Sequence, residues 1–574
     1  MSDTVASILL KILKKHGIRH IFGLPAAQIS MVMDGAGRDS FFTYVTTRHE
    51  EAAGHMAHAI GKLTDGMAVC FGTVGPGATN MVPGVAAAWA DNIPMLVLTP
   101  NNQSRLVYPS HDLLQNVDQI GLYKPITKWS AVINHPDRAP ELIERAIHVA
   151  RSGRPGPVHL DIPCDIHTAA VVHDIDSVPT LAQPRPVPSP VEVAALVERI
   201  AAARRPLFIG GGGVVRSGGV NAFRELCDLT GIPASTTAHA RGLVPHRSDR
   251  YIGSGGVFAG TAFNKAAQEA DLIVAFGCKF ASMTPVNKPP LAPLPAGQII
   301  VQIDIDADSL GRNVPIQAGL VGDARETLGS LTRALAGRQL SIDAKWVESL
   351  VIERRQWQAR LEAIADEGSE EGTNLLNEAA LVRAVAGALP SRTMVAIDGG
   401  QIMEWGHSFI EVDHPQDMLF VPGMGHLGFG LPMSIAAKLL HPERPVLCLT
   451  GDGAMGMTGQ ELETAVRYEV PVVVVVANDS HWGMYRPLGE RLYCNKNFGT
   501  KLTDVDFAAV ARGYGAQGER VHDVANLSKA VARGFASGRP YVIDVTCNFT
   551  PHPVDGFWPA VILAGAALAP VNLA

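Results

Sequence analysis

The strongest constraint on this chain is a pair of polar turns that each follow an apolar, strand-like segment. Residues 446–450 lead into Gly451-Asp452-Gly453, and residues 472–477 lead into Asn478-Asp479. Apolar runs of this length between turn residues are typical of buried parallel strands. A carboxylate at each of two strand ends can hold one hard cation such as Mg²⁺, and small residues before a helix let a diphosphate approach its N-terminus. The spacing therefore predicts a site for Mg²⁺ and a diphosphate at the edge of a sheet.

Composition limits the class of protein. The chain has 574 residues, of which 47% are hydrophobic and 18% charged, which fits a large α/β enzyme and excludes a disordered or fibrous chain. The formal net charge is −7 without a Lys/Arg-rich stripe, so we expect no nucleic-acid partner. The seven cysteines are scattered, and we see neither a signal peptide nor an apolar run long enough to span a bilayer. We expect a reduced, cytoplasmic protein without a membrane partner.

Strand-like and helix-like segments alternate in three blocks. This pattern predicts an α/β fold with three doubly wound, parallel-sheet domains, whose ligands bind at the carboxyl ends of the strands. We expect domains over 1–168, 191–336 and 375–548, joined by a Pro-rich linker over 169–190 and by a linking helix and linker over 337–374, and followed by a packed C-terminal arm over 549–574. The expected strands are 44–46, 68–72, 95–99, 158–162, 207–210, 272–276, 299–303, 394–397, 446–450, 472–477 and 541–545.

Two further motifs lie in the first block. Arg48-His49-Glu50 follows the strand 44–46 and opens a helix that extends to about Leu63. An acidic residue in a first helical turn is usually only a favourable contact with the helix dipole, so this motif alone does not establish a catalytic role. Residues 75–80 predict a tight turn into a helix, and by default Gln115 would be an exposed polar side chain.

Taken together, these motifs resemble those of thiamine-diphosphate (ThDP) enzymes of the acetolactate synthase and pyruvate oxidase superfamily. Within that superfamily the first block looks closest to benzaldehyde lyase, through residues 47–55 and 118–129. The resemblance covers residues 1–548 and implies a pyrimidine-binding, a middle and a diphosphate-binding domain, in that order. It also implies that each cofactor lies between two chains, with Glu50 from one and Asp452 from the other. The resemblance therefore predicts a homodimer at minimum, and usually a homotetramer.

The resemblance assigns roles to individual residues. Glu50 would promote the imino tautomer of the cofactor's aminopyrimidine, and Gln115 would orient the reacting carbonyl compound. Gln28 stands where benzaldehyde lyase has a His that handles protons, a departure that puts identical substrate chemistry in doubt. His426 either faces the substrate or is a hydrogen-bonded surface residue.

The cofactor-binding residues follow from the same resemblance. Leu427 would support the bent cofactor, and Met403, Trp482 and Met484 would form an apolar substrate pocket unless they are ordinary core. Asp479 replaces the usual Asn as a metal ligand beside Asp452, and the backbone carbonyl of His481 would complete the set of protein ligands. The residues expected to contact the cofactor are Gly400, Gln401, Gly425, Leu427, Gly451, Asp452, Gly453, Ala454, Asp479 and Met484.

The middle block holds the run Gly210–Gly213, which without the spaced GxGxxG pattern is a weak nucleotide motif. Flavin-dependent relatives carry an Arg-Phe-Asp-Asp-Arg stretch where this chain has Lys279-Phe280-Ala281-Ser282-Met283. This departure argues against bound FAD.

The sequence thus predicts a ThDP- and Mg²⁺-dependent lyase or carboligase that acts on a small-molecule carbonyl substrate, a 2-keto acid or an acyloin, through an enamine. The alternative within the superfamily is a 2-hydroxyacyl-CoA or oxalyl-CoA lyase, with the C-terminal arm closing over the thioester. A catalytically silent, regulatory member is a third hypothesis, against which the retention of Glu50 and Asp452 argues.

Overall fold

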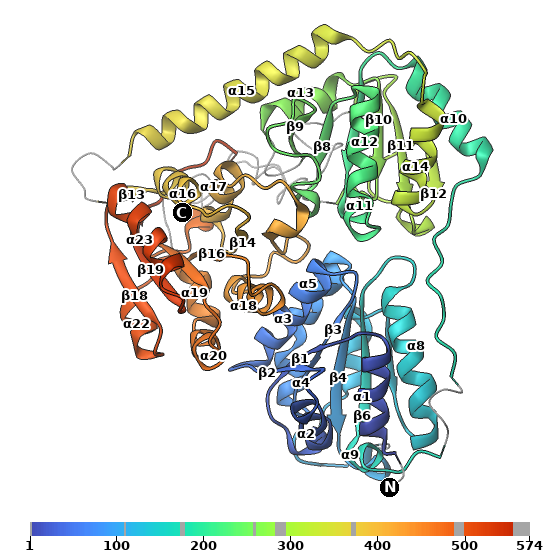
Figure 1. Cartoon of the computed structure of the whole chain (residues 1–574), viewed down its shortest axis with the longest axis vertical. Helices are drawn as coiled ribbons and strands as arrows, with labels where there is room; N and C mark the ends of the chain where they lie inside the picture. Colours follow the sequence, from blue (N-terminus) through green and yellow to red (C-terminus); the bar gives the residue numbers. More distant parts are fainter. Residues whose placement is uncertain are drawn as a thin grey trace, which may run out of the picture.

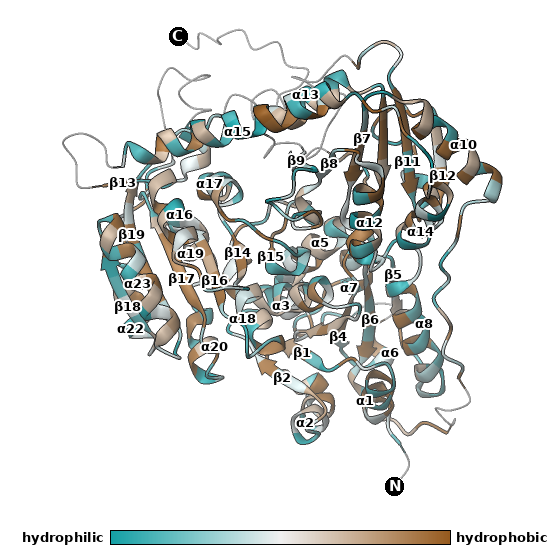
Figure 2. Ribbon diagram, turned by 45° about the horizontal axis from the view of Figure 1, so that its top comes forward, coloured by the Kyte–Doolittle hydropathy of each residue, from teal (hydrophilic) through white to brown (hydrophobic). Residues whose placement is uncertain are grey.

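The fold consists of three α/β domains, each built on a parallel sheet flanked by helices (Figure 1). The computed structural model describes residues 3–107, 111–172, 178–255, 260–281, 294–368, 375–486 and 499–554. The prediction of three parallel-sheet domains is confirmed. Figure 2 shows why each sheet is covered by helices: the strands are mainly hydrophobic, while the outer faces of the helices are hydrophilic.

The N-terminal domain has a six-stranded sheet in the order β2-β1-β3-β4-β6-β5. Its strands are β1 (His20–Gly23), β2 (Thr43–Thr46), β3 (Ala68–Phe71), β4 (Met95–Asn101), β5 (Trp129–Val132) and β6 (Pro157–Pro163). Its helices are α1 (Val5–Lys15), α2 (Ser30–Arg38), α3 (Glu50–Leu63), α4 (Pro76–Asn80), α5 (Val82–Asp91), α6 (Ser104–Val107), α7 (Gln119–Tyr123), α8 (Ala139–Arg151) and α9 (Cys164–His167), with 3₁₀ turns η1 (Ala27–Ile29), η2 (Lys124–Ile126) and η3 (Pro136–Arg138).

The middle domain has a six-stranded sheet in the order β12-β11-β10-β7-β8-β9. Its strands are β7 (Pro206–Gly210), β8 (Ala234–Thr236), β9 (Tyr251–Ser254), β10 (Leu272–Phe276), β11 (Ile299–Asp304) and β12 (Ala318–Val321). Its helices are α10 (Pro190–Ala202), α11 (Gly212–Arg216), α12 (Val220–Thr230), α13 (Thr261–Glu269) and α14 (Ala324–Leu335), with 3₁₀ turns η5 (Ala238–Ala240) and η6 (Ala307–Ser309). The long helix α15 (Ala344–Asp366) then runs from this domain to the third (Figure 1).

The C-terminal domain has a seven-stranded sheet in the order β13-β19-β17-β16-β14-β15, with β18 also paired to β19. Its strands are β13 (Leu376–Asn377), β14 (Met394–Ile397), β15 (Met418–Leu419), β16 (Val446–Gly451), β17 (Val473–Asn478), β18 (Gln517–Val521) and β19 (Tyr541–Asn548). Its helices are α16 (Glu378–Gly387), α17 (Gln401–Phe409), α18 (Gly430–Leu440), α19 (Asp452–Thr458), α20 (Glu461–Arg467), α22 (Phe507–Gly513) and α23 (Val524–Ala536), with 3₁₀ turns η7 (Pro415–Asp417) and η8 (Gly483–Tyr485).

Each sheet has a point at which the strand order changes direction. In the N-terminal sheet it lies between β1 and β3, in the middle sheet between β7 and β10, and in the C-terminal sheet between β14 and β16. A crevice opens at such a point beyond the carboxyl ends of the strands, and ligands of open α/β sheets bind there. The topology therefore indicates one candidate ligand site in each domain.

Each expected strand is present within a few residues of its predicted bounds. After Gly451 the chain forms two short helices, α19, which starts at Asp452, and α20. The Pro-rich linker ends where Pro190 opens α10, with Ser189 as its capping residue. The expected arm over 549–574 is described only as far as Val554, and most of it lies outside the described residues.

Helix α3 connects the N-terminal and C-terminal domains. It is buried along almost its whole length and packs against both α5 and α18. Gly54 of α3 lies against Gly84 of α5 so closely that a Cβ on Gly54 would come within 3.0 Å of the Gly84 backbone. Among the described residues, no helix is both long and apolar enough to cross a membrane.

Candidate active site

Three acidic residues follow three neighbouring strands of the C-terminal sheet. Asp398 comes directly after β14, Asp452 directly after β16 and Asp479 directly after β17. Since β14, β16 and β17 are adjacent and parallel, their carboxyl ends meet at one edge, where the strand order changes direction. The local sequence thus brings the three carboxyl groups to the predicted ligand crevice.

Asp452 and Asp479 form a buried acidic pair. Burial and the neighbouring charge of Asp479 raise the pKa of Asp452 to about 7, and burial also raises the pKa of Asp479. The Oδ2 atoms of both carboxyl groups are buried, and neither has a hydrogen-bond partner among the described residues. The remaining oxygens accept from the backbone, with the N–H of Gly453 donating to Asp452 Oδ1 over 2.8 Å and that of His481 donating to Asp479 Oδ1 over 3.0 Å. The guanidinium of Arg486 lies 4.0 Å from Asp479 Oδ2. Two buried acidic oxygens that accept no hydrogen bond fit a hard divalent cation, which would supply further positive charge.

The loops around this pair approach one another closely. Gly399 has φ +104°, and a Cβ there would come within 3.1 Å of the backbone nitrogen of Gly451. A Cβ on Gly400 would come within 2.8 Å of Met484, and one on Gly453 within 2.6 Å of the Trp482 ring. The structure therefore brings the predicted residues Gly400, Gly451, Gly453, Asp479 and Met484 together, and glycine allows the loops to pack this closely.

Asp398 holds the segment over 423–430 in place, a role that was not expected from the sequence. Its Oδ1 accepts from the N–H groups of Gly399 and Gly428, and its Oδ2 accepts from that of Gly430. Burial raises the pKa of Asp398 to about 7 despite these three donors. The segment that contains the predicted residues Gly425 and Leu427 is thereby fixed to the same sheet edge as Asp452. The sequence feature that could have indicated this role is the position of Asp398 directly after a predicted strand.

A second group of predicted residues lies in the N-terminal domain. Glu50 opens α3, is 6% exposed, and accepts a hydrogen bond of 3.0 Å from Asn80 Nδ2. A Cβ on Gly77 would come within 3.1 Å of Glu50 Oε1. The 72–77 turn therefore packs directly on the carboxyl group.

The two predicted glutamines border the same turn. Thr73 Oγ1 donates to Gln28 Oε1 over 3.1 Å, so Gln28 lies beside the carboxyl end of β3. Gln115 has a positive φ of +62°. Its carbonyl oxygen lies so close to Gly75 that a Cβ at residue 75 would be 2.2 Å away, so only glycine fits at residue 75. Glu50, Gln28 and Gln115 are thus gathered around residues 72–77, at the point where the N-terminal strand order changes direction.

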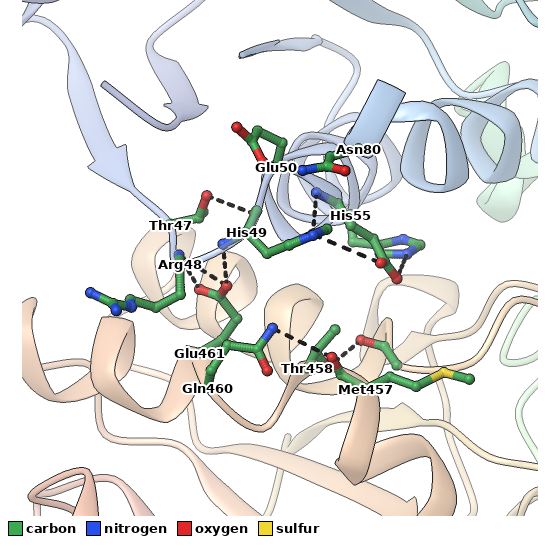
Figure 3. A network of polar contacts seen from close by, with 12 residues as sticks. Thr47, Arg48, His49, Glu50, His55, Asn80, Met457, Thr458, Gln460 and Glu461 are labelled. Carbon is green, nitrogen blue, oxygen red and sulfur yellow. Dashed lines mark hydrogen bonds and ion pairs between the residues drawn. The ribbon is translucent and has the colours of Figure 1, made fainter. Parts of the chain in front are cut away.

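Direct contacts join the N-terminal and C-terminal domains within the chain. Glu461 of α20 accepts hydrogen bonds from the backbone N–H groups of Arg48 and His49 (Figure 3). Tyr468 accepts a further one from the N–H of Thr46. These bonds fix the loop that leads into Glu50. His426 lies between the domains, 3.4 Å from Glu51 of α3 and 21% exposed, so it is neither fully exposed nor part of the Asp452–Asp479 pair.

Three family models match the chain in the same order as the three domains. They are the thiamine pyrophosphate enzyme N-terminal TPP binding domain over residues 3–122, the central domain over 193–331, and the C-terminal TPP binding domain over 398–545. A "Probable acetolactate synthase large subunit" of Methanocaldococcus jannaschii is 31% identical over 95% of this chain and 92% of its own length. The chain belongs to the thiamine pyrophosphate enzyme family.

Other relatives of this thiamine pyrophosphate enzyme have different names. The "Probable 2-ketoarginine decarboxylase" of Pseudomonas aeruginosa is 33% identical over 94% of both chains. The acetolactate synthase isozyme 3 large subunit of Escherichia coli is 28% identical over 95% of both chains. Full-length similarity to a synthase and to a decarboxylase establishes a thiamine-dependent enzyme with carboligases among its relatives.

In this thiamine pyrophosphate enzyme a cavity of about 410 Å³ lies at the change of strand direction of the middle domain and is also lined by residues of the other two domains. Beside it, the backbone N–H groups of Gly211 and Gly213 donate to the carbonyl oxygens of Phe276 and Gly277. Charged side chains of both signs line the cavity, the basic ones being Lys62, Arg151, Arg154, Arg185, Arg216 and Lys279 and the acidic ones Asp65, Asp91, Asp304 and Asp323. This mixed lining does not identify a ligand. The absence of FAD therefore stays a prediction, based on the stretch 279–283 that differs from the stretch of flavin-dependent relatives. Residues 282 and 283 lie outside the described part of the chain.

Proposed function

We propose that this enzyme is a ThDP- and Mg²⁺-dependent carbon–carbon lyase or carboligase that acts on 2-keto acids or acyloins. The observation that carries the proposal is the pair of buried Oδ2 atoms of Asp452 and Asp479 that accept no hydrogen bond, at the sheet edge where the glycine turns meet. The name of one full-length relative describes decarboxylation of a 2-keto acid, which supports this substrate class.

Each group of residues has a distinct task in this proposal. Asp452 and Asp479 would hold Mg²⁺, with the backbone carbonyl of His481 as a further ligand. Glu50 would hold a proton at the pyrimidine ring, because it is a buried carboxyl group at the first turn of α3. When bound, ThDP supplies the electron sink that cleavage of a bond next to a carbonyl requires. Gln28 and Gln115 would orient the carbonyl compound through their amides.

A substrate panel tests this proposal. Purified protein with ThDP and Mg²⁺ receives pyruvate, benzoylformate, benzoin or a 2-hydroxyacyl-CoA, each with and without an acceptor aldehyde, and products are read by mass spectrometry. We expect turnover of a keto acid or of the acyloin. Turnover of the thioester alone would contradict the proposal and place the chain with the CoA-dependent lyases.

We further propose that the two groups of residues meet between chains, in a homodimer that can pair into a tetramer. Large apolar side chains are exposed beside both groups. Next to Gln28 and Gln115 in the sequence, Met31 is 41% exposed and Leu114 is 82% exposed. Next to Gly425 and Met484, Met424 is 53% exposed and Tyr485 is 65% exposed. Exposed apolar surface around two half-sites favours an interface there.

Mixing two inactive variants tests the shared site. Glu50→Gln and Asp452→Asn chains are combined under mild dissociating conditions and then reassembled. We expect about a quarter of wild-type activity to return, because half of randomly formed dimers are mixed and each has one of its two sites intact. No recovery, despite mixed dimers detected by differential tags, would show that each site is built from one chain.

A further inference from the structure

A cluster of three side chains lies apart from the Asp452–Asp479 pair. Glu51 and His55 are one turn apart on α3, so both project from the same face of the helix. His426 approaches them from the segment that Asp398 fixes, with its ring centroid 5.0 Å from that of His55. One ligand atom from each of Glu51, His55 and His426 lies within 4.8 Å of the other two.

The polar atoms of this cluster lack the partners that burial demands. His55 is fully buried, and neither of its ring nitrogens has a hydrogen-bond partner among the described residues. The same holds for Glu51 Oε1. Unpartnered buried polar atoms are rare because each costs roughly 1–3 kcal/mol. Glu51 Oε1 faces both His55 Nε2 and His426 Nε2 without a hydrogen bond to either, which indicates that a group is missing from the cluster.

The spacing fits a shared metal ion better than direct hydrogen bonds. Glu51 Oε1 is 3.4 Å from His426 Nε2 and 3.8 Å from His55 Nε2. Two ligands of a tetrahedral ion with bonds of about 2.05 Å are about 3.3 Å apart. The first distance already matches, and the second needs a shift of about half an ångström.

The donor set selects the class of ion. Two imidazole nitrogens and one carboxylate suit Zn²⁺ and similar transition metals, whereas Mg²⁺ prefers oxygen ligands throughout. His426 and Glu51 are 21% and 17% exposed, which leaves a path for the ion and room for a fourth ligand.

We propose that Glu51, His55 and His426 form a second metal site, which binds one divalent transition-metal ion of the Zn²⁺ type. The ion would tie the helix that begins at Glu50 to the segment that contains Gly425 and Leu427. It would therefore hold the two domains of one chain in a fixed relation. The Mg²⁺ proposed at Asp452 and Asp479 is a separate ion of different chemistry.

Cobalt provides a test that does not depend on turnover. The enzyme is treated with a chelator, dialysed, saturated with ThDP and Mg²⁺, and titrated with Co²⁺ while visible absorption is recorded. We expect one equivalent of Co²⁺ to give ligand-field bands, and Zn²⁺ to abolish them stoichiometrically. In His426→Ala and in Glu51→Gln the apparent Kd should rise by more than about tenfold, since even residues behind the ligands change metal affinity by 10–100-fold.

Two further variants show whether the Co²⁺ bands arise from these three side chains. His441 lies 3.7 Å from Glu443 without a third ligand nearby among the described residues, so His441→Ala is the matched control and should leave the titration unchanged. Asp452→Asn removes the proposed Mg²⁺ ligand, and Co²⁺ binding should persist in it even if the proposed function is wrong. Absence of ligand-field bands, or bands that survive in His426→Ala, would overturn the second site.

Discussion

Replacement of Glu50 by Gln is expected to abolish catalysis while the cofactor still binds. Gln has the same shape, so its side chain can still contact Asn80 and the 72–77 turn, but it cannot exchange a proton. Loss of general acid–base catalysis typically costs about 10²–10⁴-fold in rate. The measurement is deuterium exchange at C2 of ThDP bound to the purified enzyme, followed by quenching and NMR, because it requires no knowledge of the substrate. We expect the exchange rate to fall by that factor with the Kd for ThDP nearly unchanged.

An exposed acid provides the control for this experiment. Glu141 pairs with Arg138 on the surface, and Glu141→Gln should leave the exchange rate within about twofold of wild type. If Glu50→Gln exchanged at the wild-type rate, its buried carboxyl would be structural and the assignment of the proton to Glu50 would be wrong.

The sheets and the strand ends could be predicted from the sequence because their signal is local. The apolar runs that became β14, β16 and β17 are almost entirely buried, and such strands show as continuous hydrophobic segments. The short and partly exposed strands were missed, among them β5, in which all four residues are half-buried, and β18. Their pattern does not differ from that of a loop, and only pairing with β6 or β19 fixes them as strands.

The parts of the site that depend on tertiary contacts could not be predicted. The side chain of Asp398 accepts hydrogen bonds from N–H groups 30 and 32 residues further along the chain, and no local pattern indicates these partners. His426 was considered for the substrate or the surface, but its neighbours Glu51 and His55 belong to another domain. No local pattern records which helix packs beside a loop, so contacts of this kind require the structure.

Replacement of Asp452 by Asn is expected to have opposite effects on binding and on stability. Without one of the two carboxylates, the site should hold Mg²⁺ much more weakly, and the Kd for ThDP measured with Mg²⁺ should rise by at least about 100-fold, because a carboxylate attracts a hard cation more strongly than a neutral amide. The metal-free variant should nevertheless be more stable than metal-free wild type. Burial and the charge of Asp479 oppose ionisation of Asp452, whose pKa is raised to about 7, and near pH 7 a neutral amide removes that cost, by up to about 4 kcal/mol.

Denaturant unfolding with a chelator present measures the second effect, and calorimetric titration with ThDP and Mg²⁺ measures the first. Asp34→Asn, at an exposed carboxyl that pairs with Arg38, should change neither. A structural role for Asp452 would instead make the metal-free variant less stable, since its Oδ1 accepts from Gly453 and the loop would loosen. Gain of stability together with loss of binding is the combination expected of a ligand-binding carboxylate, because burial disfavours its charge until the positively charged ligand arrives.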